Sequence, residues 1–289
     1  METKTRQLLF FVTLPLLVIA AMLNYQNWLT SKHIDHLTVD FFNVGQGDSF
    51  LITTMHGHQI LVDAGPGSSV IGELSKAMPI FDKTIDMIVV THPHTDHIEG
   101  FIQVLQRYDV KKVLLPNVDF DSPQNEEFTK LVKEEGAEVV YAQEGQRWTL
   151  DEATVLGVMY PTSTEEAHPK ESADVNNSSV VAMLIFGRTK FLLTGDSGTE
   201  IEDQLIKRFS LDADVLKVGH HGSEYSSSQE FLDKVTPEFA VIQVGKNNYG
   251  HPAPETLERL KNEGAKVLRN DQDGTIEFQS DGSSLVLKN

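Results

Sequence analysis

Cysteine is absent from all 289 residues. Its absence excludes disulfide bonds, thiolate metal ligands and a cysteine nucleophile, and it leaves the redox state of the compartment undefined. Basic residues are also scarce, because 24 lysines and arginines oppose 42 aspartates and glutamates, for a net charge of −18. Such an acidic surface repels a polyphosphate chain at long range, so broad, non-specific binding of nucleic acid is disfavoured.

Long apolar runs are rare too, and the one near the N-terminus is short. Residues 8–23 carry no charge and follow Lys4 and Arg6. A cleaved secretory signal has this layout. A membrane anchor needs about 20 apolar residues, which the run reaches only with Tyr25 and Trp28 at the membrane interface. We favour the anchor, and both interpretations place the rest of the chain outside the cytoplasmic membrane, either tethered or secreted.

The remaining sequence predicts an α/β fold. Short apolar strands alternate with helical segments through two halves, and each half opens with an antiparallel hairpin. Hairpins with covering helices predict two mixed sheets stacked between helical layers. We expect a loop over residues 91–97 and a helix over 101–108. The predicted organisation is an N-terminal segment, residues 1–36, and one domain, residues 37–289.

The stretch VVTHPHTDHIEG, residues 89–100, concentrates ligand-type side chains directly after a buried strand. A loop that leaves a strand can turn alternate side chains to one side, so His92 and His94 can converge on one ion. Asp96 and His97 can then face a second ion. Imidazole and carboxylate ligands suit zinc, manganese or iron. A solvated histidine-rich loop is the alternative, which this density of ligands disfavours.

Other predicted strands end in polar side chains in the same way. These are Asp63 in LVDAGPG, Asp196 in LLTGDSG, His220 and His221 in LKVGHHGS, and His251 in NYGHPAP. We expect these strand ends to lie at one rim of the sheets. The glycine-rich GQGD run lacks the lysine and spacing of a phosphate-binding P-loop, so it predicts a tight strand connection.

Taken together, HPHTDH, DAGPG, TGD and HHGS resemble the metallo-β-lactamase superfamily. The resemblance implies an αββα sandwich with one or two metal ions at the sheet edges. In order, FFNVGQGDSFLI, THPHTDHIEG, NNSSVV, FLLTGD, LKVGHHGS, NNYGHP and LRNDQDGTIEF are similar to the hydrolase domain of ComEC, the bacterial competence DNA-uptake channel. The similarity covers residues 37–289 and implies a stand-alone, ComEC-like hydrolase at or outside the bacterial cell membrane.

The resemblance also implies roles for particular residues. Two divalent ions, zinc or manganese, would be held by His92 and His94 at the first ion, by Asp96, His97 and His220 at the second, and by Asp196 between them. His221 is the alternative to His220. Asp63 would orient the ligand loop through hydrogen bonds.

One region departs from the superfamily pattern. Many members place a further metal histidine before the TGD strand, where this chain reads DVNNSSV. We expect Asn177 or Ser178 to face the site, and His168 is a weaker candidate ligand. The first ion would then be weakly held, which leaves open a single-metal or manganese enzyme.

The expected chemistry is hydrolysis, because a pair of divalent ions activates water and stabilises the attacking and leaving oxygens. Asp96 would orient the water, and His251 would donate to the leaving group or serve only as structural support. Lys217, Ser223 and Asn248 are further candidates for substrate contact, with a solvated strand or turn chemistry as the alternative.

The favoured activity is a phosphodiesterase, with DNA as one candidate substrate. The same metal pair would serve another ester or amide bond, such as a lactone, a β-lactam or a phosphocholine ester, because the surrounding loops select the substrate. A non-catalytic binding module is disfavoured by the ligand set. No obligate protein partner is inferred.

Overall fold

The computed structural model describes residues 13–16, 19–20, 22, 35–163 and 175–288. Backbone contacts divide the chain into two compact units, Met1–Ile34 and Asp35–Asn289. Most of the expected N-terminal anchor lies outside the described residues. Among the residues that are described, no helix is both long enough and apolar enough to cross a membrane.

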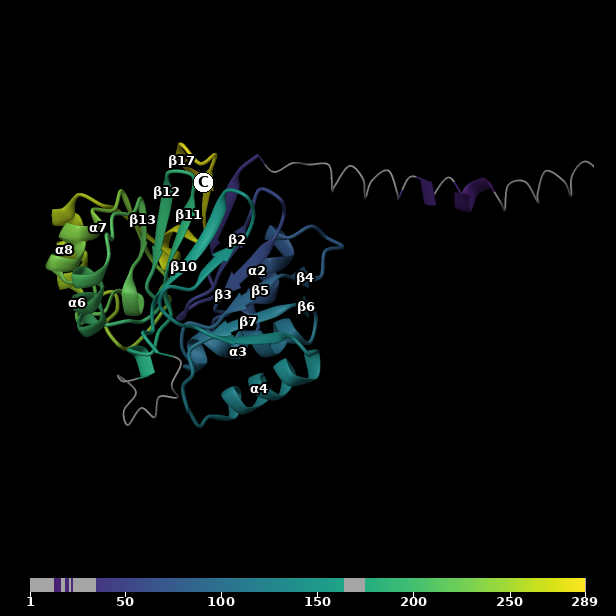
Figure 1. Cartoon of the computed structure of the whole chain (residues 1–289), viewed down its shortest axis with the longest axis horizontal. Helices are drawn as coiled ribbons and strands as arrows, with labels where there is room; N and C mark the ends of the chain where they lie inside the picture. The colour runs from purple at the N-terminus through teal and green to yellow at the C-terminus, as the bar shows by residue number, and fades with distance from the viewer. Residues whose placement is uncertain (1–12, 17–18, 21, 23–34, 164–174, 289) are drawn as a thin grey trace, which may run out of the picture. The chain divides into compact units, whose positions relative to one another are not determined.

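Two sheets form the centre of the second unit (Figure 1). The larger sheet has eight strands in the order β17 (Leu285–Lys288), β16 (Ile276–Ser280), β1 (Leu37–Phe41), β2 (Phe50–Thr53), β3 (Gln59–Val62), β5 (Met87–Val89), β7 (Lys112–Leu115) and β8 (Glu138–Tyr141). The smaller has seven, in the order β15 (Lys266–Arg269), β14 (Phe239–Ile242), β13 (Val215–Lys217), β12 (Thr189–Leu193), β11 (Val181–Phe186), β10 (Thr154–Tyr160) and β9 (Arg147–Thr149). A separate two-stranded ladder joins β4 (Thr84–Ile85) and β6 (Asp109–Val110). Both large sheets mix antiparallel and parallel pairs, as predicted.

Helices cover the outer face of each sheet (Figure 1). The larger sheet is covered by α2 (Ser69–Ala77), α3 (Thr95–Leu105) and α4 (Pro123–Glu135). The smaller is covered by α6 (Thr199–Arg208), α7 (Gln229–Val235) and α8 (Pro254–Glu263). Two short helical turns, η1 (Gly219–Gly222) and α9 (Asn270–Asp273), complete the set. This layering is the αββα sandwich of the metallo-β-lactamase fold and confirms the predicted α/β class.

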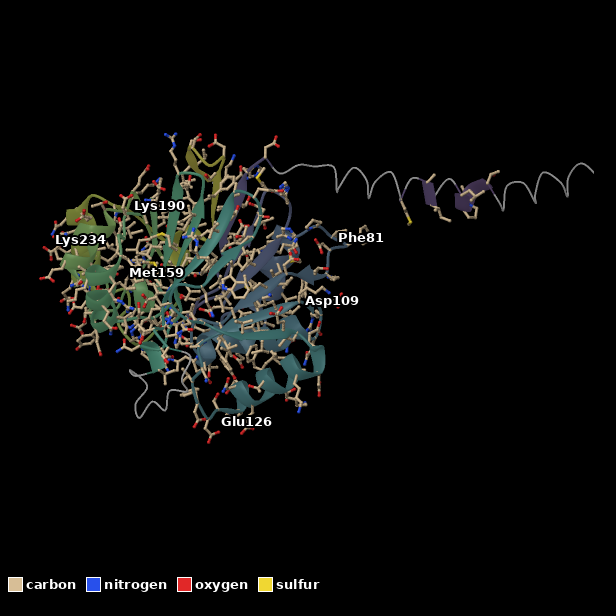
Figure 2. All side chains as sticks on the ribbon, viewed as in Figure 1. Phe81, Asp109, Glu126, Met159, Lys190 and Lys234 are labelled. Atoms are coloured by element: carbon tan, nitrogen blue, oxygen red, sulfur yellow. The ribbon has the colours of Figure 1, made fainter. Side chains whose placement is uncertain are left out.

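The core follows from the two-residue period of the strands. In β2, Phe50 and Ile52 face the other sheet while Leu51 packs under the helices. In β12, Phe191 faces the opposite sheet while Leu192 packs under its own helical layer. Side chains of alternating direction therefore fill three apolar layers, each large side chain contributing about 1.5–3 kcal/mol on burial. Figure 2 shows side chains filling the space between the sheets and the helices.

The helix expected at residues 101–108 is instead α3, which begins at Thr95. Asp96 and His97 therefore lie on the first helical turn and not in a loop. The prediction started too late because the apolar spacing of α3 becomes visible only from Ile98 and Phe101, which are both fully buried. The short elements β9 and α9 were also missed, since neither carries a clear apolar period.

Parallel strands bring the polar loops to one edge. In the larger sheet β3 pairs in parallel with β5, and in the smaller sheet β12, β13 and β14 are parallel neighbours. The carboxyl ends of parallel strands meet at the same edge of a sheet. The segments that follow β3, β5, β12, β13 and β14 therefore carry the polar side chains described next.

Candidate metal centre

Asp196 lies at the centre of a cluster of histidines. Its Oδ2 atom is 3.3 Å from Nε2 of His97, 3.4 Å from Nε2 of His221 and 3.9 Å from Nε2 of His92. His94 adjoins the cluster, because its Nδ1 is 3.1 Å from Nε2 of His92. The structure thus brings together side chains from the ends of β5, β12 and β13.

Three groups of potential ligand atoms share His97. They are His92, His97 and Asp196; Asp96, His97 and His221; and Asp48, Asp63 and His97. A fourth group contains Asp48, Asp196 and His221. Within each group the ligand atoms all lie within 4.8 Å of one another. This spacing suits one or two divalent ions bound by imidazole and carboxylate groups.

Hydrogen bonds behind the histidines fix the direction of each ring. His97 Nδ1 lies 2.8 Å from Asp63 Oδ2, and His92 Nδ1 lies 3.1 Å from the Thr91 hydroxyl. His221 Nδ1 lies 2.9 Å from the backbone oxygen of Gln243. Each ring therefore presents Nε2 to the cluster, which is how proteins orient a metal-binding histidine.

The backbone bends sharply where the cluster is assembled. Asp63, His220 and His221 adopt positive φ angles of 51°, 48° and 53°. Residues other than glycine rarely adopt this left-handed conformation, and such strain is concentrated at functional sites. At His221 the turn directs the imidazole back toward Asp96 and Asp196.

The acidic and basic side chains of the cluster stabilise each other in their ionised forms. Burial alone would lower the pKa of His221, but Asp196 and Asp48 raise it to about 10. Burial likewise opposes the charge on His97, but Asp196 and Asp63 raise its pKa well above the ordinary value. Burial would raise the pKa of Asp96, but His97 and His221 lower it. Positive charge is thus favoured at the position where the carboxylates converge.

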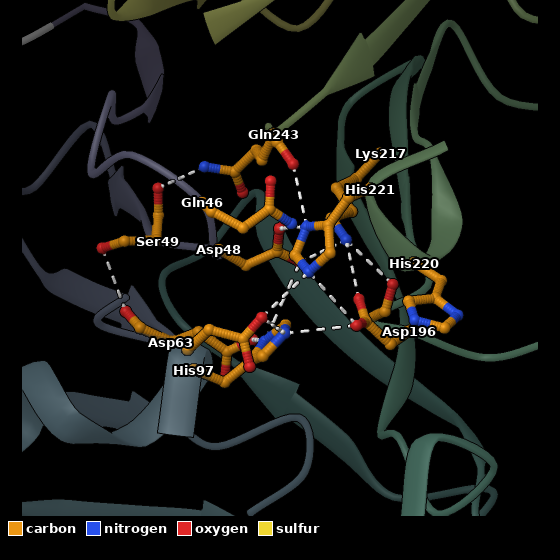
Figure 3. A network of polar contacts seen from close by, with 12 residues as sticks. Gln46, Asp48, Ser49, Asp63, His97, Asp196, Lys217, His220, His221 and Gln243 are labelled. Carbon is orange, nitrogen blue, oxygen red and sulfur yellow. Dashed lines mark hydrogen bonds and ion pairs between the residues drawn. The ribbon is translucent and has the colours of Figure 1, made fainter. Parts of the chain in front are cut away.

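The atoms of the cluster fit a metal ion by a second criterion. Among the described residues, His97 Nε2 is a buried atom at the cluster without a hydrogen-bond partner. Buried polar atoms of native proteins are nearly always paired, so such atoms call for an explanation. A divalent ion at the cluster would satisfy His97 Nε2 directly, and Figure 3 shows that ring directed at Asp196.

A cleft of about 340 Å³ opens at the cluster. Its lining residues are mostly polar or aromatic: Gln46, His94, Thr95, Asp96, Phe120, Ser122, Asn176, Asp196, His220, His221, Tyr249 and His251. None of these residues is a lysine or an arginine. Burial, together with His220 and His221, lowers the pKa of His251 to about 4. His251 is therefore a neutral imidazole near pH 7.

A sequence model of the metallo-beta-lactamase superfamily matches residues 42–246. The chain belongs to this superfamily. It is similar to ComE operon protein 3 of Bacillus subtilis (strain 168), with 32% identity over 262 residues, 83% of this chain and 33% of that protein. Competence protein ComA of Neisseria gonorrhoeae is 31% identical over 268 residues, 91% of this chain and 35% of that protein. The chain thus spans about a third of the length of these curated relatives, and the predicted resemblance to ComEC-like competence proteins is confirmed.

A solved structure agrees on the fold. The metallo-beta-lactamase fold protein YhfI from Bacillus subtilis superimposes with a TM-score of 0.59 at 15% identity, covering 85% of this chain and 100% of that protein. At this identity the likeness establishes the superfamily fold alone.

Between the paired histidines, the geometry corrects the predicted preference for His220. It is His221 whose Nε2 lies 3.2 Å from Asp96 Oδ2 and that belongs to the ligand groups. His220 Nε2 lies 3.4 Å from Asn176 Nδ2, and its ring centre is 5.3 Å from that of His251. His220 and His251 therefore lie together on the wall of the cleft.

The asparagine and serine region also differs from the prediction. Asn177 accepts a hydrogen bond from the backbone of Gly198, and the Ser178 hydroxyl donates to the backbone oxygen of Val175, so neither side chain is directed at the metal cluster. Their neighbours reach the site instead. Asn176 lines the cleft, and the Ser179 hydroxyl lies 3.4 Å from His92 Nδ1. The other weak candidate, His168, lies outside the described residues.

Three expected substrate contacts are placed elsewhere. Lys217 is 1% exposed, so it is neither solvated nor open to a substrate. Ser223 is buried in a turn, where its hydroxyl accepts from the backbone of Tyr225. Asn248 is exposed and does not line the cleft. Side-chain burial at these positions depends on distant segments, which the local sequence does not reveal.

Two further residues of the site come from the GQGD run, where the sequence also suggests that Asp48 supports the metal loop through hydrogen bonds. Asp48, in the connection between β1 and β2, is 1% exposed, and its Oδ1 lies 3.2 Å from His221 Nδ1. Gly47 beside it packs on the backbone oxygen of Asp96, where a Cβ atom would come within 2.2 Å. The GQGD run is thus the tight connection that was predicted, and it delivers a carboxylate to the metal cluster.

Proposed function

We propose that this chain is a metal-dependent phosphodiesterase, with DNA among its substrates. The observation that carries the proposal is the position of the ligand groups, three of which share His97, beside a cleft of about 340 Å³. Divalent ions held by His92, His94, Asp96, His97, Asp196 and His221 would supply activated water and Lewis acidity.

The cleft favours recognition of an anion by the metal centre itself. Among the residues that the structure describes, no lysine or arginine lines it, and the chain as a whole is strongly acidic. A phosphodiester would therefore be held chiefly by bound cations. Tyr249 is 78% exposed and lines the cleft together with Phe120. Exposed aromatic rings of this kind stack on nucleobases, which supports a nucleotide-bearing substrate.

Individual side chains have distinct tasks in this proposal. Asp96 is partly exposed toward the cleft, with 37% of its side chain accessible, so its carboxylate can orient a water and accept its proton. His251 is neutral and can donate a hydrogen bond from its N–H to an oxygen of the substrate. Asp63 and Gln243 hold the imidazoles of His97 and His221.

We further propose that residues 8–23 tether the chain to the cytoplasmic membrane with the hydrolase outside. The support is the basic N-terminus followed by an apolar run, together with similarity to proteins named for competence. Protease treatment of spheroplasts should degrade the hydrolase domain, and carbonate washing should leave it in the membrane fraction. Protection from protease in intact spheroplasts would contradict this location.

The activity is tested with the purified full chain, loaded with Mn²⁺ or Zn²⁺. The substrates are bis-p-nitrophenyl phosphate, single-stranded DNA and double-stranded DNA. We expect cleavage that EDTA abolishes and that Asp96→Asn lowers by more than about 100-fold, because the substitution removes a ligand charge without changing side-chain shape. Asp203→Asn, on the exposed face of α6, is the matched control and should retain full activity.

The outcome of this assay distinguishes a phosphodiesterase from a hydrolase of another ester or amide bond. Metal-dependent cleavage that is lost in Asp96→Asn supports the phosphodiesterase, and the DNA lanes show whether it is a nuclease. No cleavage by protein shown to hold its metal would overturn the phosphodiesterase. A panel of lactone, β-lactam and phosphocholine esters would then be tested with the same variants.

A further inference from the structure

Lys217 is a buried cation directly beneath the metal cluster. It ends β13 and is 1% exposed, and its Nζ donates to the backbone oxygen of Gly195 at 2.8 Å. Nζ also forms an ion pair with Asp48. Lysine is almost never fully buried unless it is paired. The placement therefore indicates a function for the charge inside the protein.

The partners of Lys217 are connected to the proposed ligands. Asp48 contacts Lys217 through Oδ2, while its Oδ1 lies 3.2 Å from His221 Nδ1. Lys217 Nζ itself lies 3.6 Å from Asp196 Oδ1. Figure 3 shows the side chains of Asp48, His221, Lys217 and Asp196 close together in one network of polar contacts.

In Asp196 and in His221, the two polar atoms of the side chain face different partners. Asp196 turns Oδ1 toward Lys217 and Oδ2 toward His97 and His221. His221 turns Nδ1 toward Asp48 and Gln243, and Nε2 toward Asp96 and Asp196. In both residues one atom faces Lys217 or its partner Asp48, and the other faces the metal cluster.

Solvent has little room to replace these contacts. The Asp48 carboxylate is held by ion pairs with Lys217 Nζ and His221 Nδ1. The cavity beside Lys217 and Asp48 has a volume of about 10 Å³, enough for roughly one water. The positions of Asp48 and Asp196 therefore depend on the ammonium group.

We propose that Lys217 is a positioning residue of the metal centre, which together with Asp48 holds His221 and Asp196 so that Nε2 and Oδ2 face the ions. This inference rests on the proposed metal-dependent function. The competing explanation is a structural ion pair that only joins the β1–β2 connection to β13. Groups behind a ligand commonly change metal affinity about 10–100-fold, whereas a structural pair changes stability alone.

The deciding variant is the double substitution Lys217→Met/Asp48→Asn in the full chain. It removes both charges and keeps the side-chain volumes similar, so the fold is expected to survive. Isothermal titration with Mn²⁺ and with Zn²⁺ should show affinity at least about 10-fold below that of the unmodified chain. The melting temperature of the metal-free protein, measured in parallel, reports how much the substitutions change the stability of the fold.

The single variant Asp48→Asn gives a second reading. It removes the carboxylate that pairs with Lys217 and leaves the ammonium close to Asp196. The unpaired positive charge would repel a divalent ion. Its metal affinity should fall further than that of the double variant, and its melting temperature should be lower. Lys190→Met/Asp212→Asn is the matched control, because it removes a solvent-accessible pair, 3.0 Å apart, that joins β12 to the segment before β13, and it should leave metal affinity unchanged.

Each outcome decides the question. A folded Lys217→Met/Asp48→Asn protein with unaltered Mn²⁺ and Zn²⁺ affinity overturns the positioning function. If circular dichroism shows that this variant is unfolded without metal, its refolding is titrated with Mn²⁺ and Zn²⁺, and refolding at the metal concentrations that saturate the unmodified chain overturns the positioning function equally. If the unmodified chain binds neither metal, the proposed metal-dependent function itself is overturned. This result differs from a failure of the positioning proposal, because it is seen before any variant is compared.

Discussion

Asp63 Oδ2 lies 2.8 Å from His97 Nδ1, while the carboxylate also accepts hydrogen bonds from the backbone and hydroxyl of Thr91. One fully buried carboxylate thus joins the end of β3 to the ligand loop after β5 and to the first turn of α3. The orientation of the His97 ring and the path of the loop are determined by the same group.

Asp63→Asn should weaken metal binding. Asparagine tolerates the left-handed backbone at this position, so the variant tests the carboxylate and not the turn. An amide cannot accept from Thr91 and His97 as a carboxylate does, and we expect metal affinity to fall about 10–100-fold. Titration with Zn²⁺ and urea unfolding measure the two effects. Unaltered affinity in a folded variant would show that His97 does not need this support.

His221 and His220 should respond differently to substitution by alanine. His221→Ala removes an Nε2 that lies 3.2 Å from Asp96 and 3.4 Å from Asp196, so metal affinity should fall by more than about 100-fold. His220→Ala should keep the metal and lower turnover, since this ring contacts Asn176 and His251 on the cleft wall. Metal content after dialysis and the rate on bis-p-nitrophenyl phosphate separate the two. The reverse pattern would restore His220 as the ligand.

Much of the fold follows from local sequence pattern. The two-residue apolar period of strands such as β11 and β12 is strong, and the hairpin they form was predicted together with the sandwich. The start of α3 was not, because Thr95 and Asp96 offer no apolar period at the first turn. Local pattern therefore predicts where buried elements lie better than where they begin.

The clustering of side chains was predictable where ligand-type residues crowd into one short segment, as at His92 and His97. The choice between His220 and His221 depends on two consecutive left-handed residues, which sequence spacing does not encode. The burial of Lys217 depends on Asp48, which reaches it from the β1–β2 connection. Contacts between distant segments determine these roles, and a single sequence carries no direct signal for them.

Asp40 should make stability depend on pH. It is 9% exposed, pairs across strands with Glu277, and shares a pocket with Glu73 and Lys76. Burial, Glu277 and Glu73 raise its pKa to about 7. The folded state therefore keeps a proton that the unfolded chain loses above about pH 4, so stability falls as pH rises from 4 to 7.

Asp40→Asn removes this dependence. Relative to the unmodified chain it should gain stability at pH 8, with an upper limit of about 4 kcal/mol from the pKa shift, and gain little at pH 4. Urea unfolding at both values measures the difference, and Asp203→Asn on the exposed face of α6 controls for net charge. An equal gain at both pH values would show that proton binding at Asp40 is not the cause.

The close approach of α3 to the segment after β3 should be sensitive to one methyl group. A Cβ atom at Gly100 would lie 2.0 Å from the backbone oxygen of Ala64. Gly100→Ala should therefore destabilise the fold by about 2–3 kcal/mol. Gly72, in α2, has open space around its Cβ position, so Gly72→Ala should instead stabilise by up to about 1 kcal/mol. Urea unfolding of the two variants gives opposite signs if the contact is as tight as the backbone indicates.

Gly100→Ala should also weaken metal binding, although Gly100 does not contact the cluster. The backbone nitrogen of Ala64 donates to the oxygen of His97 at 2.8 Å, and that of Gly100 donates to Gly65 at 2.9 Å. A displaced α3 would break this pairing and move Asp96 and His97 together, since both lie on its first turn. Mn²⁺ titration of Gly100→Ala and Gly72→Ala measures the effect. Equal affinity in both variants would mean that the ligands follow their own loop and do not move with the helix.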